Sequence, residues 1–118
     1  MGDMDQQALI FYLSDIGERA DEMGLDALDA LLALQEDLAE AIEPRGIGEV
    51  DGNEIAMDDS EGSLYAYGPD ARAMLQAALP VICRSPLAVG GQVYLRYGDD
   101  GAAEETFRLS DLCAKRNA

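Results

Sequence analysis

The spacing of the hydrophobic residues changes near residue 46, and this change limits what the chain can fold into. Before it, residues 4–42 carry hydrophobic side chains at the spacing of amphipathic helices. Those side chains are Leu9, Leu13, Ile16, Ala20, Met23, Leu28, Leu31, Leu32, Leu38 and Ile42. Gly24 followed by Asp26 is typical of one helix ending and another beginning. We therefore predict two helices, as an antiparallel hairpin or as one long kinked helix, that end before Pro44.

After residue 46 the pattern favours strands separated by turns. Segments 50–57 and 63–67 read as strands joined by an acidic loop. Pro69 at the first helical position, with Asp70 beside it, predicts the start of a third helix that runs to residue 82. Two further strands, 92–97 and 104–109, flank Asp99-Asp100-Gly101, a strong hairpin signal. The predicted order is two helices, two strands, one helix and two strands.

These elements predict an α+β fold in a single domain, residues 1–118. A helical hairpin occupies residues 1–45, and a strand-helix-strand module of ββαββ order occupies residues 46–118. The helix between strands 63–67 and 92–97 is long enough for a crossover between parallel neighbours. We therefore expect a mixed four-stranded sheet with the helices packed on one face.

One part of the chain resembles small uncharacterised bacterial α+β proteins. The resemblance rests on Leu64-Tyr65-Ala66-Tyr67-Gly68-Pro69-Asp70-Ala71, on Pro86-Leu87 and on Leu95-Arg96-Tyr97-Gly98, within about the last 60 residues. It implies a compact strand-helix-strand module and transfers no activity and no functional residue.

The charge of the chain is strongly negative: 24 acidic residues face 8 basic ones, for a formal net charge of −16. Such a field repels nucleic-acid backbones and anionic lipid surfaces, so we expect neither nucleic acid nor a membrane as a partner. The chain has no histidine, which excludes Ser-His-Asp and Cys-His catalysis and histidine-ligated metals within this chain alone. The first 45 residues carry 12 of the acidic residues but only 2 basic ones.

The two cysteines, Cys83 and Cys113, are too few for a disulfide framework or a zinc site, so we expect reduced thiols. No hydrophobic run approaches the length of a membrane span, and the acidic first residues differ from a signal peptide. We therefore expect a cytoplasmic location.

An acidic segment could supply oxygen ligands to calcium or magnesium. Its members are Asp51, Asn53, Glu54, Asp58, Asp59 and Glu61. Their spacing differs from the calcium-loop pattern, which favours a solvated loop, and we predict no metal and no cofactor. Carboxylates are so numerous that chance alone brings some together, so no catalytic residue is assigned and an enzyme is the less expected class.

Strand alternation places Tyr65 and Tyr67 on one sheet face, and Tyr94 with Arg96 opposite their hydrophobic neighbours. If the hydrophobic side faces the helices, these four residues line the other face. Tyrosine and arginine dominate protein interfaces, so this face is the candidate interaction surface. The alternative is a sheet face whose tyrosine hydroxyls simply lie in water.

Two classes of function remain. The first is an acidic protein-binding module for a basic partner such as a toxin, a nuclease or a nucleic-acid-binding factor, as an inhibitor or immunity-type protein would be. The second is a small carboxylate-dependent enzyme or divalent-metal-binding protein that uses the acidic segment. The hydrophobic side of the helical hairpin could also pair with a second copy, which would give a homodimer.

Overall fold

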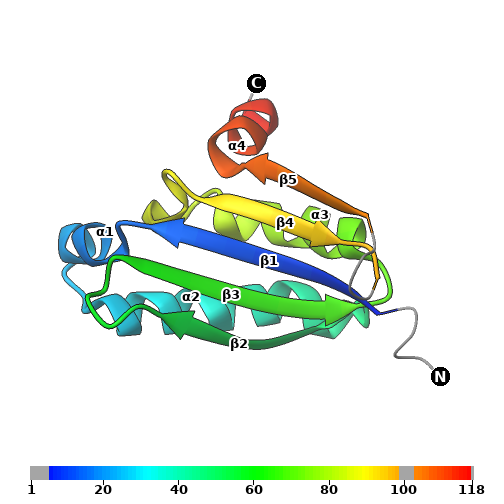
Figure 1. Cartoon of the computed structure of the whole chain (residues 1–118), viewed down its shortest axis with the longest axis horizontal. Helices are drawn as coiled ribbons and strands as arrows, with labels where there is room; N and C mark the ends of the chain where they lie inside the picture. Colours follow the sequence, from blue (N-terminus) through cyan, green and yellow to red (C-terminus); the bar gives the residue numbers. More distant parts are fainter. Residues whose placement is uncertain (1–5, 99–102, 118) are drawn as a thin grey trace.

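Five antiparallel strands form one sheet, in the spatial order β2-β3-β1-β4-β5 (Figure 1). The computed structural model describes residues 6–98 and 103–117, with side chains up to Lys115. The strands are β1 (Gln7–Ser14), β2 (Glu49–Ile55), β3 (Glu61–Gly68), β4 (Gln92–Arg96) and β5 (Glu104–Arg108).

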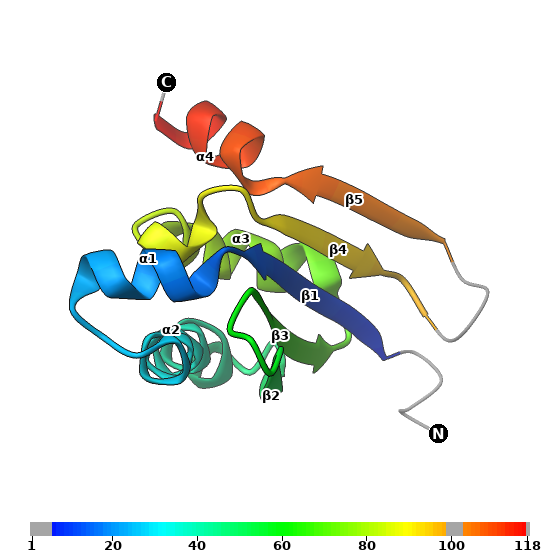
Figure 2. The ribbon, with the colours of Figure 1, turned by 60° about the vertical axis from the view of Figure 1, so that its left-hand side comes forward.

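Three of the helices cover one face of this sheet, as predicted (Figure 2). They are α1 (Ile16–Met23), α2 (Ala27–Ile42) and α3 (Ala71–Ile82). The 3-10 helices η2 (Glu43–Arg45) and η3 (Pro86–Ala88) follow α2 and α3, and α4 (Leu109–Asn117) follows β5. The opposite face of the sheet carries no helix of the described chain (Figures 1 and 2).

The first predicted helix is wrong, because its N-terminal half is a strand. Residues 7–14 form β1, the central strand of the sheet, and not part of a helical hairpin. The run from Ala8 to Leu13 is continuously hydrophobic and includes Ile10 and two aromatic residues, which is typical of a strand buried on both faces. Leu9 and Leu13 do face the core, but they do so with a period of two, together with Phe11.

Strand β1 also changes the predicted topology. The sheet has five strands and not four, and it is antiparallel and not mixed. Strands β3 and β4 run in the same direction, as the α3 crossover requires, but β1 lies between them and pairs antiparallel with both. The predicted strands at 50–57, 63–67, 92–97 and 104–109 are confirmed as β2 to β5. The predicted hairpin turn at 99–101 lies outside the described residues.

The helix boundary predicted at Gly24 and Asp26 is confirmed, whereas the third helix begins at Ala71, two residues after the predicted first residue, Pro69. Gly24 ends α1 in the left-handed conformation, with φ of 76°, and Asp26 is the N-cap of α2. The side chain of Asp70 caps α3 by accepting hydrogen bonds from the backbone amides of Arg72 and Ala73, at 3.1 and 3.2 Å. These local signals set the ends of the helices that cover the sheet.

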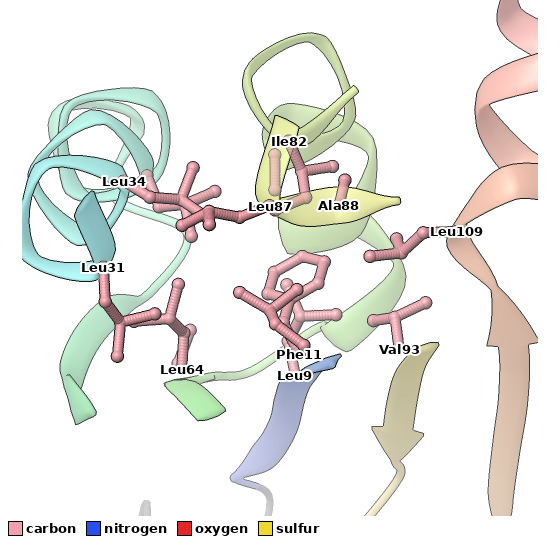
Figure 3. Close-up of a cluster of buried hydrophobic side chains, with 14 of the residues drawn as sticks. Leu9, Phe11, Leu31, Leu34, Leu64, Ile82, Leu87, Ala88, Val93 and Leu109 are labelled. Atoms are coloured by element: carbon pink, nitrogen blue, oxygen red, sulfur yellow. The ribbon is translucent and has the colours of Figure 1, made fainter. Parts of the chain in front are cut away.

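The hydrophobic core lies between the sheet and its helices (Figure 3). Strands β1, β3 and β4 supply one side of it, and α2, α3 and η3 supply the other. The labelled side chains are Leu9, Phe11, Leu31, Leu34, Leu64, Ile82, Leu87, Ala88, Val93 and Leu109. Leu109, the first residue of α4, is fully buried, so the start of α4 is anchored in the same core.

The C-terminal region departs from the prediction as well. Strand β5 ends at Arg108, and α4 was not expected from the sequence. Cys113 in α4 forms a disulfide with Cys83, the C-cap of α3, so the expectation of two reduced thiols is wrong. The two cysteines are 30 positions apart in the sequence, and the chain between them brings α4 back to the end of α3. No helix of the described residues is long and hydrophobic enough to cross a membrane.

Candidate functional site

The four residues of the predicted interaction surface lie on the face of the sheet that the helices leave uncovered. The register places Tyr65 and Tyr94 on either side of Ile10 in β1. It places Tyr67 and Arg96 on either side of Ala8 in the same way. The residues that alternate with them, among them Leu9, Leu64, Ala66 and Leu95, are buried in the core on the helical side. We call this uncovered side of the sheet the open face.

The open face carries a fourth tyrosine that was not predicted from the sequence. Tyr12 in β1 follows Ala8 and Ile10 on the same side of the strand and is 44% exposed. The rings of Tyr12 and Tyr94 meet edge to face, with centroids 4.9 Å apart. The missed signal was the alternation inside the hydrophobic run 8–13, which places every second residue on this side once the run is read as a strand.

The tyrosines form an ordered layer over small and aliphatic residues of β1. Ile10 is only 6% exposed and Ala8 only 3% exposed, although no described helix covers this side. The Tyr94 hydroxyl donates a hydrogen bond to Oε1 of Gln92 at 3.0 Å. The rings of Tyr12 and Tyr94 are therefore held by each other and by Gln92, which are neighbours on the sheet itself.

The charges of the open face differ between its two sides. On the β4–β5 side, Arg96 forms an ion pair with Glu104, with 3.0 Å between Nε and Oε2. On the β2 side, Glu49 and Glu54 lie opposite Tyr67 and Ser63, and neither forms an ion pair with a described residue. The β2 side of the open face is therefore the acidic one.

The pKa of Tyr65 reflects its place on this face. Burial raises the pKa of its phenol and the nearby carboxylate of Glu54 adds to the rise, against a hydrogen bond with Ser63 that lowers it. Because its pKa is raised, the phenol of Tyr65 is protonated more readily in the folded than in the unfolded state, and this difference stabilises the fold. The stabilisation is complete below the ordinary tyrosine pKa of about 10 and is lost as the pH rises through the raised pKa.

This shift gives a measurable expectation. In a spectrophotometric titration of the folded protein, some tyrosine phenols should ionise at a pH above the ordinary tyrosine pKa. Tyr65→Phe should remove one phenol from this late phase. Tyr97→Phe should remove another, because burial and a hydrogen bond to Glu105 also raise the pKa of Tyr97. An unchanged late phase in Tyr65→Phe would show that the ring lies in water and contradict the packing described for the open face.

The residues considered as metal ligands are divided between two places. Asp51 and Glu54 lie on β2, whereas Asp58 and Asp59 lie in the turn before Glu61 at the start of β3. Within residues 6–98 and 103–115, no three Asp, Glu or Cys side chains gather closely enough to hold a metal ion.

The turn itself has a structural role. The carboxylate of Asp58 accepts hydrogen bonds from the amide and the hydroxyl of Ser60, at 3.0 and 2.6 Å, which hold the pKa of Asp58 below its usual value. The carbonyl oxygens of Asp59 and Ser60 accept hydrogen bonds from the amides of Gly17 and Asp15. The turn therefore attaches to the start of α1.

A hollow next to this turn gathers further carboxylates. Its acidic lining comes from the start of α1, the start of α2 and the turn. The acidic residues are Asp15, Glu18, Asp21, Asp26, Asp58 and Asp59. These carboxylates, together with the other acidic residues of α1 and α2, make the helical side of the molecule negatively charged.

Comparisons with known proteins give a weak structural similarity and no function. No protein-family model matches the chain, and no curated protein matches it. Among solved structures, Rv0793 from Mycobacterium tuberculosis is similar, with a TM-score of 0.47 and 13% sequence identity over 86% of this chain and 92% of that one. At this level of similarity no site and no activity carries over.

Proposed function

We propose that this chain is a protein-binding module that holds a basic protein partner on the open face. The observation that carries the proposal is the gathering of Tyr12, Tyr65, Tyr67, Tyr94 and Arg96 on the side of the sheet that no described helix covers. Aromatic residues and arginine are the types enriched at protein interfaces, and they supply most of the binding energy there.

The order of the tyrosine layer supports this role. Tyr12 and Tyr94 already pack edge to face, and Ile10 is already covered by its neighbours. A partner that docks on such a layer has few side chains left to immobilise. Binding then costs less conformational entropy than binding to a mobile surface would.

The negative charge supports a basic partner. A net charge of −16 on 118 residues attracts basic proteins over several ångströms and accelerates their encounter at low salt. The described residues form two ion pairs, Arg72 with Glu105 and Arg96 with Glu104, so most of the acidic side chains are not neutralised within the described chain. A second copy of the chain carries the same charge, which opposes a homodimer.

An inhibitor or immunity-type role belongs to this proposal when the basic partner is a toxin or a nuclease. The sequence also led us to expect a cytoplasmic location. The disulfide between Cys83 and Cys113 means that reduced thiols no longer support a cytoplasmic location, because disulfides persist mainly in oxidising compartments. The proposal concerns the charge and the open face and applies in either compartment.

Affinity capture from native cell extract, at low and at high salt, tests the proposal. We expect the wild-type chain to retain a basic protein at low salt and to release it at high salt. The double variant Tyr65→Ser, Tyr94→Ser should retain much less of that protein, because it removes two rings from the open face.

A matched control changes hydrophobic side chains on the other side of the molecule. Leu28 and Leu32 on α2 are 46% and 40% exposed, so Leu28→Ser with Leu32→Ser removes exposed hydrophobic area without touching the open face. Retention that survives the tyrosine changes but is lost with the leucine changes would contradict the proposal.

A further inference from the structure

A hollow on the acidic side of the open face combines two sets of residues that the sequence placed in different roles. Its lining comes from β2 and β3 alone. The lining residues are Asp51, Gly52, Asn53, Glu54, Tyr65 and Tyr67, and the volume is about 320 Å³. Two tyrosines from the candidate interaction surface and two carboxylates from the candidate metal segment therefore meet in one place.

A β-bulge produces this meeting. The register between β2 and β3 shifts between Val50 and Gly52, so Asp51 is an extra residue in the strand with no partner of its own. Gly52 then lies opposite Tyr65, and a Cβ atom at Gly52 would meet no atom within 4 Å. The absence of a side chain at Gly52 leaves the hollow open beside the Tyr65 ring.

The lining has the chemistry that recognises a guanidinium group. Tyrosine ring faces attract a cation, and guanidinium groups stack on such rings more readily than ammonium groups do. Carboxylates accept the parallel N–H donors of arginine. The described chain forms no ion pair with either Asp51 or Glu54, and Glu54 lies beside the Tyr65 phenol, so no basic side chain of the described residues neutralises either carboxylate.

We propose that this hollow binds an arginine side chain of the basic partner. The inference rests on the proposed function and adds to it the residue type that the β2 side of the open face recognises. Acidic residues on an edge strand such as β2 also discourage pairing with other strands. That role needs neither the two rings nor the bulge, so variants of the rings distinguish it from arginine binding.

Nuclear magnetic resonance titration with N-acetyl-arginine amide tests the inference directly. We expect saturable shifts of the backbone amides in β2 and β3, at residues 49–54 and 63–67. N-acetyl-citrulline amide, which has the same shape without the charge, should cause no saturable shift. N-acetyl-lysine amide should bind more weakly than the arginine compound, because it lacks the planar donor group.

Variants identify the contacts. The pair Asp51→Asn, Glu54→Gln should weaken binding by about fivefold or more, because it removes both carboxylates while keeping their shape. Tyr65→Leu should weaken binding by roughly twofold to fivefold, whereas Tyr65→Phe, which keeps the ring, should bind nearly as wild type. The charge-matched control is Asp37→Asn, Glu40→Gln on α2, which should change the affinity by less than about twofold.

Three outcomes would overturn the inference: shifts that do not saturate, equal effects of the two charge-neutralising pairs, or equal binding by Tyr65→Leu and Tyr65→Phe. Partner capture separates this failure from failure of the proposed function. If the wild-type chain holds its basic partner and Asp51→Asn, Glu54→Gln holds it equally well, the arginine site is wrong and the binding module stands. If the wild-type chain holds no basic partner, the proposed function itself fails.

Discussion

Phe11→Ala is expected to lower the free energy of unfolding by about 3–5 kcal/mol, the usual cost of removing a fully buried phenylalanine. Phe11 is 2% exposed and lies in the middle of the core, on the central strand of the sheet (Figure 3). Denaturant unfolding followed by circular dichroism measures the effect. The change leaves a cavity between β1 and the helices that the neighbouring strands cannot fill.

Tyr12→Ala is the matched control. Tyr12 is the next residue along β1, but it lies on the open face and is 44% exposed. We expect it to cost much less than Phe11→Ala, about 1 kcal/mol, because it loses its ring contact with Tyr94 and little buried area. Similar costs at the two positions would contradict a strand here, since adjacent residues of a strand face opposite sides of the sheet.

Cys113→Ser is expected to lower the free energy of unfolding by about 3–4 kcal/mol, from the chain entropy that a disulfide across 30 residues removes from the unfolded state. The bridge to Cys83 also holds α4 against the end of α3. Without it, α4 is attached to the core by the buried Leu109 and the partly buried Leu112, both in the first half of the helix. Hydrogen exchange in α4 should therefore rise before exchange in the sheet does.

The control for this prediction is the wild-type protein with and without a reducing agent. Reduction should lower the midpoint of denaturant unfolding to that of Cys113→Ser, and it should leave the midpoint of Cys113→Ser unchanged. A wild-type midpoint that does not respond to reduction would show that the two thiols are not bridged in solution.

The elements that the sequence predicted correctly are those with local signals. The helix from residue 71 follows a capping aspartate, Asp70, and α2 begins after Gly24 and Asp26, where both signals lie within a few residues of the helix end. Strands β2 to β5 lie next to turn-forming residues in the sequence, such as Asp58-Asp59 and Gly90-Gly91. In each case the information that defines the element lies inside it or next to it.

Strand β1 was missed because its defining contacts are distant in sequence. Its partners are β3 and β4, and both pairings join residues at least 47 positions apart, the separation of Ser14 and Glu61. Within the strand, Leu9 and Leu13 also match a helical period that continues into α1 through Ile16 and Ala20. A hydrophobic run of this length fits a helix or a buried strand by period alone, and tertiary pairing decides between them. The number of strands and the antiparallel sheet follow from this one element.

The disulfide was missed for a related reason. Cys113 lies in α4, which has little hydrophobic periodicity and was not predicted. Without α4 nothing returned the C-terminal segment toward Cys83. Two cysteines 30 residues apart then gave no reason to pair.

The candidate site was predictable in part. Alternation was sufficient to place Tyr65, Tyr67, Tyr94 and Arg96 on one face, since it depends only on the strands being real. The hollow was not predictable, because Asp51-Gly52-Asn53 reads as a turn signal whereas in the structure it is a bulge within β2. Only the register of β2 against β3 shows that the acidic segment and the tyrosines meet.

The most direct test of the account is a cross-saturation experiment on the complex with the captured basic partner. The chain is deuterated, the partner's protons are saturated, and loss of signal reports the amides of the chain that lie at the interface. We expect the loss to centre on the open face, at residues 12, 65, 67, 94 and 96. Loss centred instead on α2, on the helical side of the sheet, would contradict the account.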